Sequence, residues 1–571
     1  MVFHTMSLPA IKLPERDAIK ARFISIKSWE CPKQESSIAP PGVWSNADQD
    51  PVLDANRTWS HWAFTGYWMS DLVTVATWQV GSSILIVGLS SKDAILIMLV
   101  AGICNAVATV LNGAIGADLR IPFPIAVRAS YGYWFSYFCV VSRAILAAFW
   151  LGVQSVGGGS AVTSAITCIW PSYANLPNHL PASAHITTQA MCSYFLFHLI
   201  QFPFLLIPTY KLQKLFLVKS VLVPPMATGI LIWICVKAHG SNAILSQPAT
   251  VSGSARAWAW LSAMTSITGG FSTLTVNIPD FSRFSKSRKS QWSQLPVIPI
   301  LKVVTALFGI VATGAARVVY PGEDIWSPFG LIAKWEGSGG RFLGFVCACL
   351  WILAQVCCNI SANSVSFAND VTTLCPRWIN IKRGTILCSI IGGWALVPWL
   401  MVSSASVFLS FMSGYAVFLG PMAGIMTADY WIVRKGKYDI VGLYDPNGRY
   451  YFWKGINWRA FLANAIPVTP LLVGLAYSIS PTTVHINVGL KHLYAISWLF
   501  GYPTSIVLYT FFSYVSPPTA SMVSETTGLP ETIEAFETDS VDVENVGGGS
   551  SAASMVKRGE KGMTVDENRL S

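Results

Sequence analysis

Long apolar stretches alternate with short polar connections from about residue 62 to residue 513 of the chain. A helix that crosses a bilayer needs about 20 mostly apolar residues, and twelve stretches reach that length. We predict membrane-spanning helices over residues 62–89, 94–117, 134–159, 189–209, 216–237, 258–276, 296–320, 342–366, 383–402, 405–428, 459–477 and 489–513. The pattern therefore predicts an all-α polytopic membrane protein. Its twelve-span domain covers residues 61–514, between polar tails at 1–60 and 515–571.

Composition and charge agree with this pattern and orient it. Of the 571 residues, 53% are hydrophobic and 12% are charged, about half the charged share of a soluble domain. With both tails in the cytoplasm, the inner loops and span ends hold 18 Lys and Arg residues, Lys219 among them, and the outer ones hold 7. Cytoplasmic loops are enriched in these cations. The net charge of +10 is thereby explained without nucleic acid as a partner, since no basic helix with interleaved aromatic residues occurs.

The C-terminal tail differs from the rest of the chain in composition. From about residue 515 it is rich in Glu, Asp, Ser, Thr and Gly, and such a segment buries too little apolar surface to fold. We therefore expect residues 515–571 to be disordered. The tails offer contacts for a kinase or a ubiquitin ligase, or are simply solvated, and the sequence leaves both open.

Two spans carry features that disfavour a regular helix. Span 1 holds Asp71, Thr74 and Thr77 followed by a Gly-Ser-Ser run, and polar groups at this depth need a cavity or a partner. Local unwinding would let backbone carbonyls line a cavity; interhelical hydrogen bonds in a regular helix are the alternative. Span 6 holds the adjacent pair Gly269-Gly270, which predicts a break in that helix, with close helix packing as the alternative.

Two polar pairs lie one helical turn apart. Trp150 and Gln154 share a face of span 3, and Asn359 and Asn363 share a face of span 8. An indole beside a carboxamide suits a planar heterocycle, because the ring stacks while the amide reads its N–H and C=O edge. Both pairs equally suit contacts between helices.

The remaining intramembrane charges and the cysteines are less informative. We expect Arg143 to pair with Asp280 or to extend toward the membrane surface, and Lys302 to extend in that way. The twelve cysteines show no C-x-x-C spacing, so neither a zinc site nor a disulfide framework is indicated.

Seven motifs, in order along the chain, carry a resemblance to a known family. They are Asn46 with Arg57-Thr58-Trp59, Phe123-Pro124 with Arg128-Ala129-Ser130-Tyr131-Gly132, Phe149-Trp150 with Gln154, Asn277-Ile278-Pro279-Asp280-Phe281-Ser282-Arg283-Phe284, Asn359-Ile360-Ser361-Ala362-Asn363-Ser364, Ala428-Asp429-Tyr430-Trp431 with Arg434-Lys435-Gly436-Lys437-Tyr438, and Asn457-Trp458-Arg459-Ala460. Over residues 46 to 513 the chain resembles the nucleobase–cation symporter-1 family, and within it the fungal uracil/allantoin permease branch.

The resemblance implies a five-plus-five inverted-repeat transporter fold with two extra C-terminal helices, and substrate between spans 1, 3, 6, 8 and 10. It implies that Trp150 stacks on the substrate and that Gln154 and Asn363 hydrogen-bond it. The other implied site residues are Gly270 and Phe271 in the span 6 wall, and Phe411, Tyr415 and Leu419 at an outer gate in span 10.

The coupling ion expected for this chain is the proton. Sodium-using relatives bind the ion partly through small hydroxyl residues of span 8, where this chain has Ala354, Cys357 and Cys358. A thiol is a poor ligand for a hard cation, which prefers oxygen. The resemblance also implies proton coupling, with Asp71 and Thr77 in the coupling region. No metal or organic cofactor is expected.

We therefore expect proton-coupled import of uracil or allantoin across the plasma membrane by alternating access. Uridine, thiamine and nicotinamide riboside, which related branches carry, stay open. An enzyme is disfavoured because the chain has no His-rich metal set, nucleophile elbow or phosphate-binding loop. A sensor that binds the solute without transporting it would keep the same binding residues, so the small-molecule ligand and the bilayer are the expected partners.

Overall fold

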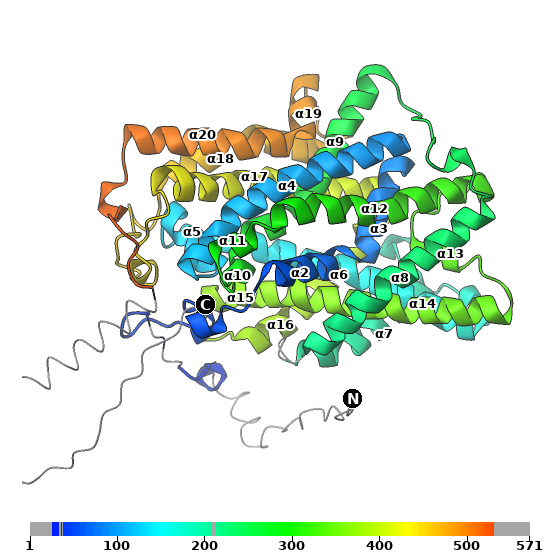
Figure 1. Cartoon of the computed structure of the whole chain (residues 1–571), viewed down its shortest axis with the longest axis horizontal. Coiled ribbons are helices and arrows are strands. Elements are labelled where there is room, and N and C mark those ends of the chain that lie inside the picture. The colour runs from blue at the N-terminus through cyan, green and yellow to red at the C-terminus, as the bar shows by residue number, and fades with distance from the viewer. Residues whose placement is uncertain (1–25, 34–35, 37, 208–211, 530–571) are drawn as a thin grey trace, which may run out of the picture.

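Helices form almost all of the ordered chain. The computed structural model describes residues 26–33, 36, 38–207 and 212–529. These residues form no β-strand and hold only three isolated bridges. The long helices run side by side along the longest axis of the molecule (Figure 1). Closely packed pairs include α9 (Gly253–Asn277) with α17 (Ala405–Ala428), α4 (Ser91–Leu119) with α12 (Gln294–Val319), and α6 (Ser136–Ile169) with α14 (Gly337–Cys358). The all-α prediction is confirmed.

Seven helices among the described residues are long and apolar enough to cross a membrane. They are α4 (Ser91–Leu119), α6 (Ser136–Ile169), α8 (Gln213–Lys237), α12 (Gln294–Val319), α14 (Gly337–Cys358), α17 (Ala405–Ala428) and α18 (Trp458–Ile479). The pair α19 (Val488–Ala495) and α20 (Ser497–Val515), bent by 80°, makes an eighth if it forms one span.

The other four predicted ranges fall on helices that are interrupted, short or less apolar. They contain α2 (His61–Leu72) with α3 (Val75–Ile86), α7 (Thr188–Leu205), α9 (Gly253–Asn277) and α16 (Ile381–Ile390). Each predicted range thus coincides with helical structure, while the number of twelve spans stays a prediction.

Span 6 is not broken where the sequence predicted a break. Helix α9 runs without interruption through Gly269 and Gly270. A Cβ atom on Gly269 would lie 2.4 Å from the carbonyl oxygen of Met412 on α17, and one on Gly270 would lie 2.7 Å from the Met412 sulfur. The glycines therefore serve close packing of α9 on α17, because any side chain at Gly269 would push the two helices apart.

Span 8 contains an irregularity that the sequence did not predict. Helix α14 continues into a π-helical turn, η8 (Asn359–Ser364), and then into α15 (Val365–Leu374). π-helical turns widen a helix locally and are frequent at functional sites. The turn holds both asparagines of the predicted span 8 pair.

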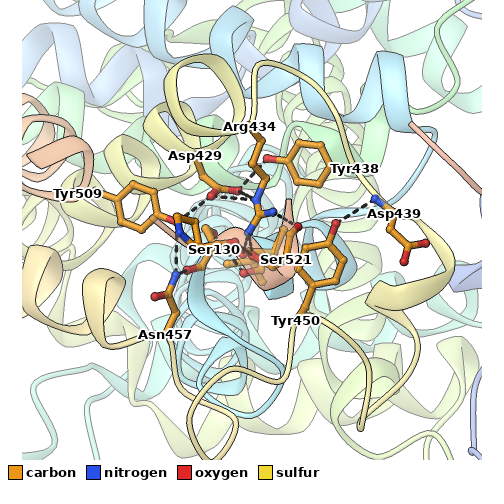
Figure 2. Close-up of polar contacts among 12 residues, drawn as sticks. Ser130, Asp429, Arg434, Tyr438, Asp439, Tyr450, Asn457, Tyr509 and Ser521 are labelled. Carbon is orange, nitrogen blue, oxygen red and sulfur yellow. Dashed lines mark hydrogen bonds and ion pairs between the residues drawn. The ribbon is translucent and has the colours of Figure 1, made fainter. Parts of the chain in front are cut away.

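One end of the bundle is closed by a buried ion pair and by the segment that follows α20 (Figure 2). The Arg434 Nε atom lies 3.0 Å from Oδ2 of Asp429. Its guanidinium also donates to the carbonyl oxygen of Ser521 at 2.5 Å and to the Ser521 hydroxyl at 3.0 Å. The Tyr438 hydroxyl donates to Asp429 at 2.8 Å, and burial, followed by the Asp429 charge, raises the pKa of Tyr438 so that it stays a donor.

The segment after α20 is therefore not disordered at its start. The Thr527 N–H donates to the carbonyl of Tyr438, and the Thr527 carbonyl accepts from the N–H of Ile440, both at 2.9 Å. The prediction of disorder is wrong for residues 516–529, since backbone groups of Ser521 and Thr527 bond the loop after α17. Residues 530–571 lie outside the described residues.

Candidate functional site

A cavity of roughly 100 Å³ lies where the break between α2 and α3 faces α6, α9 and η8. The five residues predicted to bind substrate all line it: Trp150, Gln154, Gly270, Phe271 and Asn363. They come from three helices that are far apart in the sequence. The cavity thus brings together an indole, a phenyl ring and two carboxamides.

The predicted coupling residues divide into two groups. Asp71, Thr77 and Cys358 line the same cavity. Ala354 is buried in a separate apolar cluster, and the Cys357 thiol lies 3.9 Å from a carbonyl oxygen of α8. Only the first group is therefore in reach of a solute or ion in the cavity.

The predicted unwinding of span 1 is confirmed. Helix α2 ends at Leu72 and α3 begins at Val75. Thr74 has an extended backbone, with φ −138° and ψ 165°, and its hydroxyl accepts the Thr77 N–H at 3.3 Å. The Thr74 side chain thus caps the second half of a broken span.

Two side chains from other helices satisfy the backbone at this break. The Lys219 ammonium on α8 donates to the carbonyl oxygen of Ser70, and Gln355 Oε1 accepts the Val75 N–H at 3.3 Å. Lys219 is 1% exposed, and electrostatic attraction links it to Asp71, which also accepts a hydrogen bond from the Cys358 thiol at 3.8 Å. Sequence reasoning placed Lys219 among the inner-end cations and missed this contact.

Each cavity amide is held from behind by a second amide. Gln355 Nε2 donates to Gln154 Oε1 at 2.7 Å, and Asn363 Nδ2 donates to Asn359 Oδ1 at 2.9 Å. Gln154 Nε2 and Asn363 Oδ1 have no hydrogen-bond partner among the described residues. These are the amide atoms that remain for a bound solute.

Two of the three predicted gate residues adjoin the cavity wall. The ring of Tyr415 lies 6.4 Å from the Trp150 ring and 4.9 Å from the Phe411 ring. Leu419 lies in a different apolar cluster, with residues of α5 (Phe123–Tyr131) and α18, and is fully buried. The Trp150 Nε1–H is buried without a partner within the described part of the chain.

Lys302 does not extend toward the membrane surface, so that prediction is wrong. It lines the cavity and is 4% exposed. Its Nζ atom donates to Asn105 Oδ1 at 2.7 Å and lies 4.0 Å from the centre of the Phe271 ring. Both contacts stabilise a cation inside the bundle, and they replace the hydration that Lys302 would find at the surface.

Arg143 pairs with two carboxylates rather than with Asp280 alone. Its guanidinium contacts Asp370 closely and lies 4.0 Å from Asp280, and it donates to the Ser366 carbonyl at 2.5 Å. All three charged side chains are almost fully buried. The sequence could not identify Asp370 as the nearer partner, because it showed only that Asp370 lies near a span end.

Comparisons with known proteins find a matching family model and several similar permeases. A family model described as permease for cytosine/purines, uracil, thiamine and allantoin matches residues 51–501. The uracil permease of Saccharomyces cerevisiae is 35% identical over 83% of this chain and 76% of its own length, and the allantoin permease of the same yeast is 32% identical over the same shares. An uncharacterized permease of Schizosaccharomyces pombe is 34% identical over 90% of each chain.

Solved structures share the fold. The inward-facing conformation of Mhp1 has a TM-score of 0.67 at 18% identity, covering 87% of this chain and 99% of Mhp1. Mhp1 in a closed conformation with bromovinylhydantoin bound, a nucleobase-cation-symport-1 family transporter, has a TM-score of 0.65 at 20% identity, covering 86% and 99%.

Proposed function

Because the chain belongs to the family of permeases for cytosine and purines, uracil, thiamine and allantoin, we propose that it imports a neutral nucleobase-like heterocycle of the uracil or allantoin class. Transport proceeds by proton symport and alternating access across the plasma membrane, with both tails in the cytoplasm. The proposed fold is twelve spans in a five-plus-five inverted repeat with two extra helices. The observation that carries the proposal is that Trp150, Gln154 and Asn363 line one cavity.

The chemistry of the wall supports a flat ring with a polar edge. The indole of Trp150 and the ring of Phe271 offer faces for stacking, and the amides of Gln154 and Asn363 offer hydrogen bonds. Stacking and two or three hydrogen bonds give the moderate affinity that a carrier needs in order to release its cargo. A cavity of roughly 100 Å³ suits a single ring better than a ring with an attached ribose, as in uridine.

The charges around the cavity support a neutral cargo. Lys302 lines the wall, and Lys219 lies beside the single carboxylate, Asp71. A protonated Lys302 on the cavity wall raises the free energy of a cation bound beside it. This disfavours thiamine and nicotinamide riboside, both of which carry a positive charge.

The same region supports coupling to protons rather than sodium. The Ser70 carbonyl oxygen at the break of span 1 accepts a hydrogen bond from the Lys219 ammonium. This ammonium group therefore occupies an oxygen that could otherwise bind a sodium ion. The nearby Cys358 thiol is a poor ligand for a hard cation. Both observations support proton-driven import, because a proton does not need a set of oxygen ligands as a sodium ion does.

The test is uptake of radiolabelled uracil by yeast cells that lack their own pyrimidine permeases. Unlabelled uracil, allantoin, uric acid, uridine, cytosine and thiamine compete in turn, at two external pH values and with or without sodium. We expect saturable uptake that is fastest at acidic pH, indifferent to sodium and inhibited by uracil or allantoin but not by thiamine.

Three results would contradict the proposal. Uptake that follows sodium and ignores pH would overturn the coupling. Inhibition by thiamine alone would overturn the neutral cargo. Binding of uracil to purified protein without any uptake by cells would indicate a non-transporting sensor instead.

A further inference from the structure

We propose that two side chains behind the cavity, Gln355 and Asn359, are positioning residues that fix which way the cavity amides face. They make Gln154 a donor toward the cargo and Asn363 an acceptor. The cavity then selects rings that carry a C=O group next to an N–H group. This inference rests on the proposed function and names the ring edge that the same site reads.

The orientation of the Gln355 amide is set by two backbone groups. The N–H of Val75, freed by the break in span 1, donates to Gln355 Oε1 at 3.3 Å. The carbonyl oxygen of Gln154 accepts from Gln355 Nε2 at 2.8 Å. A backbone N–H can only donate and a backbone carbonyl can only accept, so a flipped Gln355 amide would lose both bonds.

The orientation of Gln355 passes to the side chain of Gln154. Gln355 Nε2 also lies 2.7 Å from Gln154 Oε1. If the Gln154 amide were flipped, two NH₂ groups would face each other at that distance, so its oxygen must point toward Gln355. The Gln154 Nε2 end, which has no protein partner among the described residues, is left to donate into the cavity.

A second chain of bonds orients Asn359. The hydroxyl of Ser155 donates to the backbone carbonyl of Leu151 at 2.7 Å, so its oxygen is free to accept. It accepts from Asn359 Nδ2 at 3.1 Å, and Gln201 Oε1 accepts from the same nitrogen at 2.7 Å. The oxygen of Asn359 is therefore turned away from these two groups.

Asn359 in turn orients the second cavity amide. Its Oδ1 accepts from Asn363 Nδ2 at 2.9 Å, within the π-helical turn η8. The nitrogen end of Asn363 is thus directed along the helix, and its Oδ1 is the end without a protein partner. The Gln154 orientation thus traces back directly to backbone atoms, and the Asn363 orientation traces back to the Ser155 hydroxyl, whose own proton is given to the Leu151 carbonyl.

The resulting pattern distinguishes two kinds of pyrimidine edge. A lactam edge, as in uracil, accepts from Gln154 through its C=O and donates to Asn363 through its N–H. Free cytosine also has a lactam edge, at N1–H and C2=O, which a methyl group on N1 removes. The amino-imine edge of 1-methylcytosine exchanges donor and acceptor at those two positions when the ring lies in the same pose, so NH₂ would face the Gln154 amide nitrogen. A site built to hydrogen-bond one arrangement rejects the other because buried polar groups are left unpaired.

The experiment compares 1-methyluracil with 1-methylcytosine as inhibitors of labelled-uracil uptake in Gln355→Met and Asn359→Leu. Each change replaces an amide with an apolar side chain of similar size. The cavity amide that this residue held is then free to rotate. Gln291→Met is the matched control, since Gln291 is a buried amide that bonds the Val110 carbonyl and does not line the cavity. Surface abundance is measured for every variant, and inhibitor binding is repeated on purified protein.

We expect wild type and Gln291→Met to favour 1-methyluracil over 1-methylcytosine. In Gln355→Met and in Asn359→Leu the ratio of the two inhibition constants should fall about tenfold each, the effect of one hydrogen bond. A purely structural role would lower uptake without moving this ratio.

The other outcomes contradict either the assigned polarity or the proposed function. Wild type that prefers 1-methylcytosine overturns the assigned polarity without any variant, and so does an unchanged ratio in the two variants on purified protein. If wild type neither binds nor transports any ring of the panel, the proposed function fails and this inference falls with it.

Discussion

Neighbouring aromatic rings hold the Trp150 side chain in an orientation that suits stacking of a solute on the indole face. The rings of Phe408 and Tyr415 meet it at 6.4 Å, at interplanar angles of 80° and 52°. Aromatic rings prefer such edge-on contacts, which leave an indole face for the cavity. The face is therefore available without rearrangement of the wall.

We predict that Trp150→Ala raises the KM for uracil, while Trp150→Phe retains most of the affinity. Stacking of a base on an aromatic side chain contributes about 1–3 kcal/mol, which corresponds to roughly 5- to 150-fold in affinity. The measurement is uptake kinetics normalised to surface protein. A Trp150→Ala variant with the kinetics of wild type would contradict the stacking role.

At the residue scale, the sequence could predict the cavity groups but not what holds them. Trp150 and Gln154 lie four residues apart on one helix, so their shared face follows from helix geometry. Lys302 and Lys219 find their partners on helices remote in sequence, and periodicity carries no information about such contacts. Gln355 was visible as one polar residue among several in span 8.

Helices α9 and α2–α3 show why helix breaks are hard to predict at the scale of one element. The glycines of α9 lower its intrinsic propensity by about 1 kcal/mol each, yet contact with α17 keeps the helix continuous. The break in span 1 persists because Lys219 and Gln355 satisfy the freed backbone groups. A break therefore needs partners as well as a weak local sequence.

We predict that Gly269→Ala lowers stability by about 1–3 kcal/mol through overpacking. The added methyl would meet the Met412 carbonyl oxygen at 2.4 Å. Gly229→Ala on α8 is the control, because a Cβ there meets nothing within 4 Å. Thermal unfolding of the purified proteins in detergent measures the difference, and equal melting temperatures would contradict close packing of α9 on α17.

At the scale of the whole molecule, one end of the bundle is tied together by a charged hub. Arg434 joins Asp429 of the turn after α17, the Ala129 carbonyl of α5 and Ser521 of the C-terminal segment. The Tyr509 hydroxyl of α20 donates to Asp429 at 2.7 Å. Elements separated by hundreds of residues thus share one buried ion pair.

We predict that Arg434→Met destabilises the protein by about 3–5 kcal/mol, because it leaves the Asp429 charge buried and unpaired. Arg449→Met is the control: its pair with Asp439 is 2.7 Å long, but Arg449 is 39% exposed, and such pairs contribute about 0–1 kcal/mol. Melting temperature and delivery to the cell surface report the difference. Similar losses in both variants would contradict the hub.

The all-α prediction, which rested on the length of the apolar stretches, is confirmed. The prediction of a disordered tail, which rested on composition alone, is wrong for residues 516–529. Every predicted span coincides with helical structure, because burial in a bilayer demands long apolar stretches. Residues 516–529 have the composition of a polar tail, and no local pattern indicates that the backbone of Ser521 would pair with Arg434 or that of Thr527 with residues around Tyr438.

The paired C-terminal segment has a practical consequence for tagging and reporter design. A fluorescent protein fused directly after Val515, where α20 ends, would displace Ser521 and Thr527 from Arg434 and the neighbouring loop. A fusion placed after Leu529 keeps those bonds. Fluorescence readouts of folding and trafficking therefore report on the native molecule only when the junction lies beyond that residue.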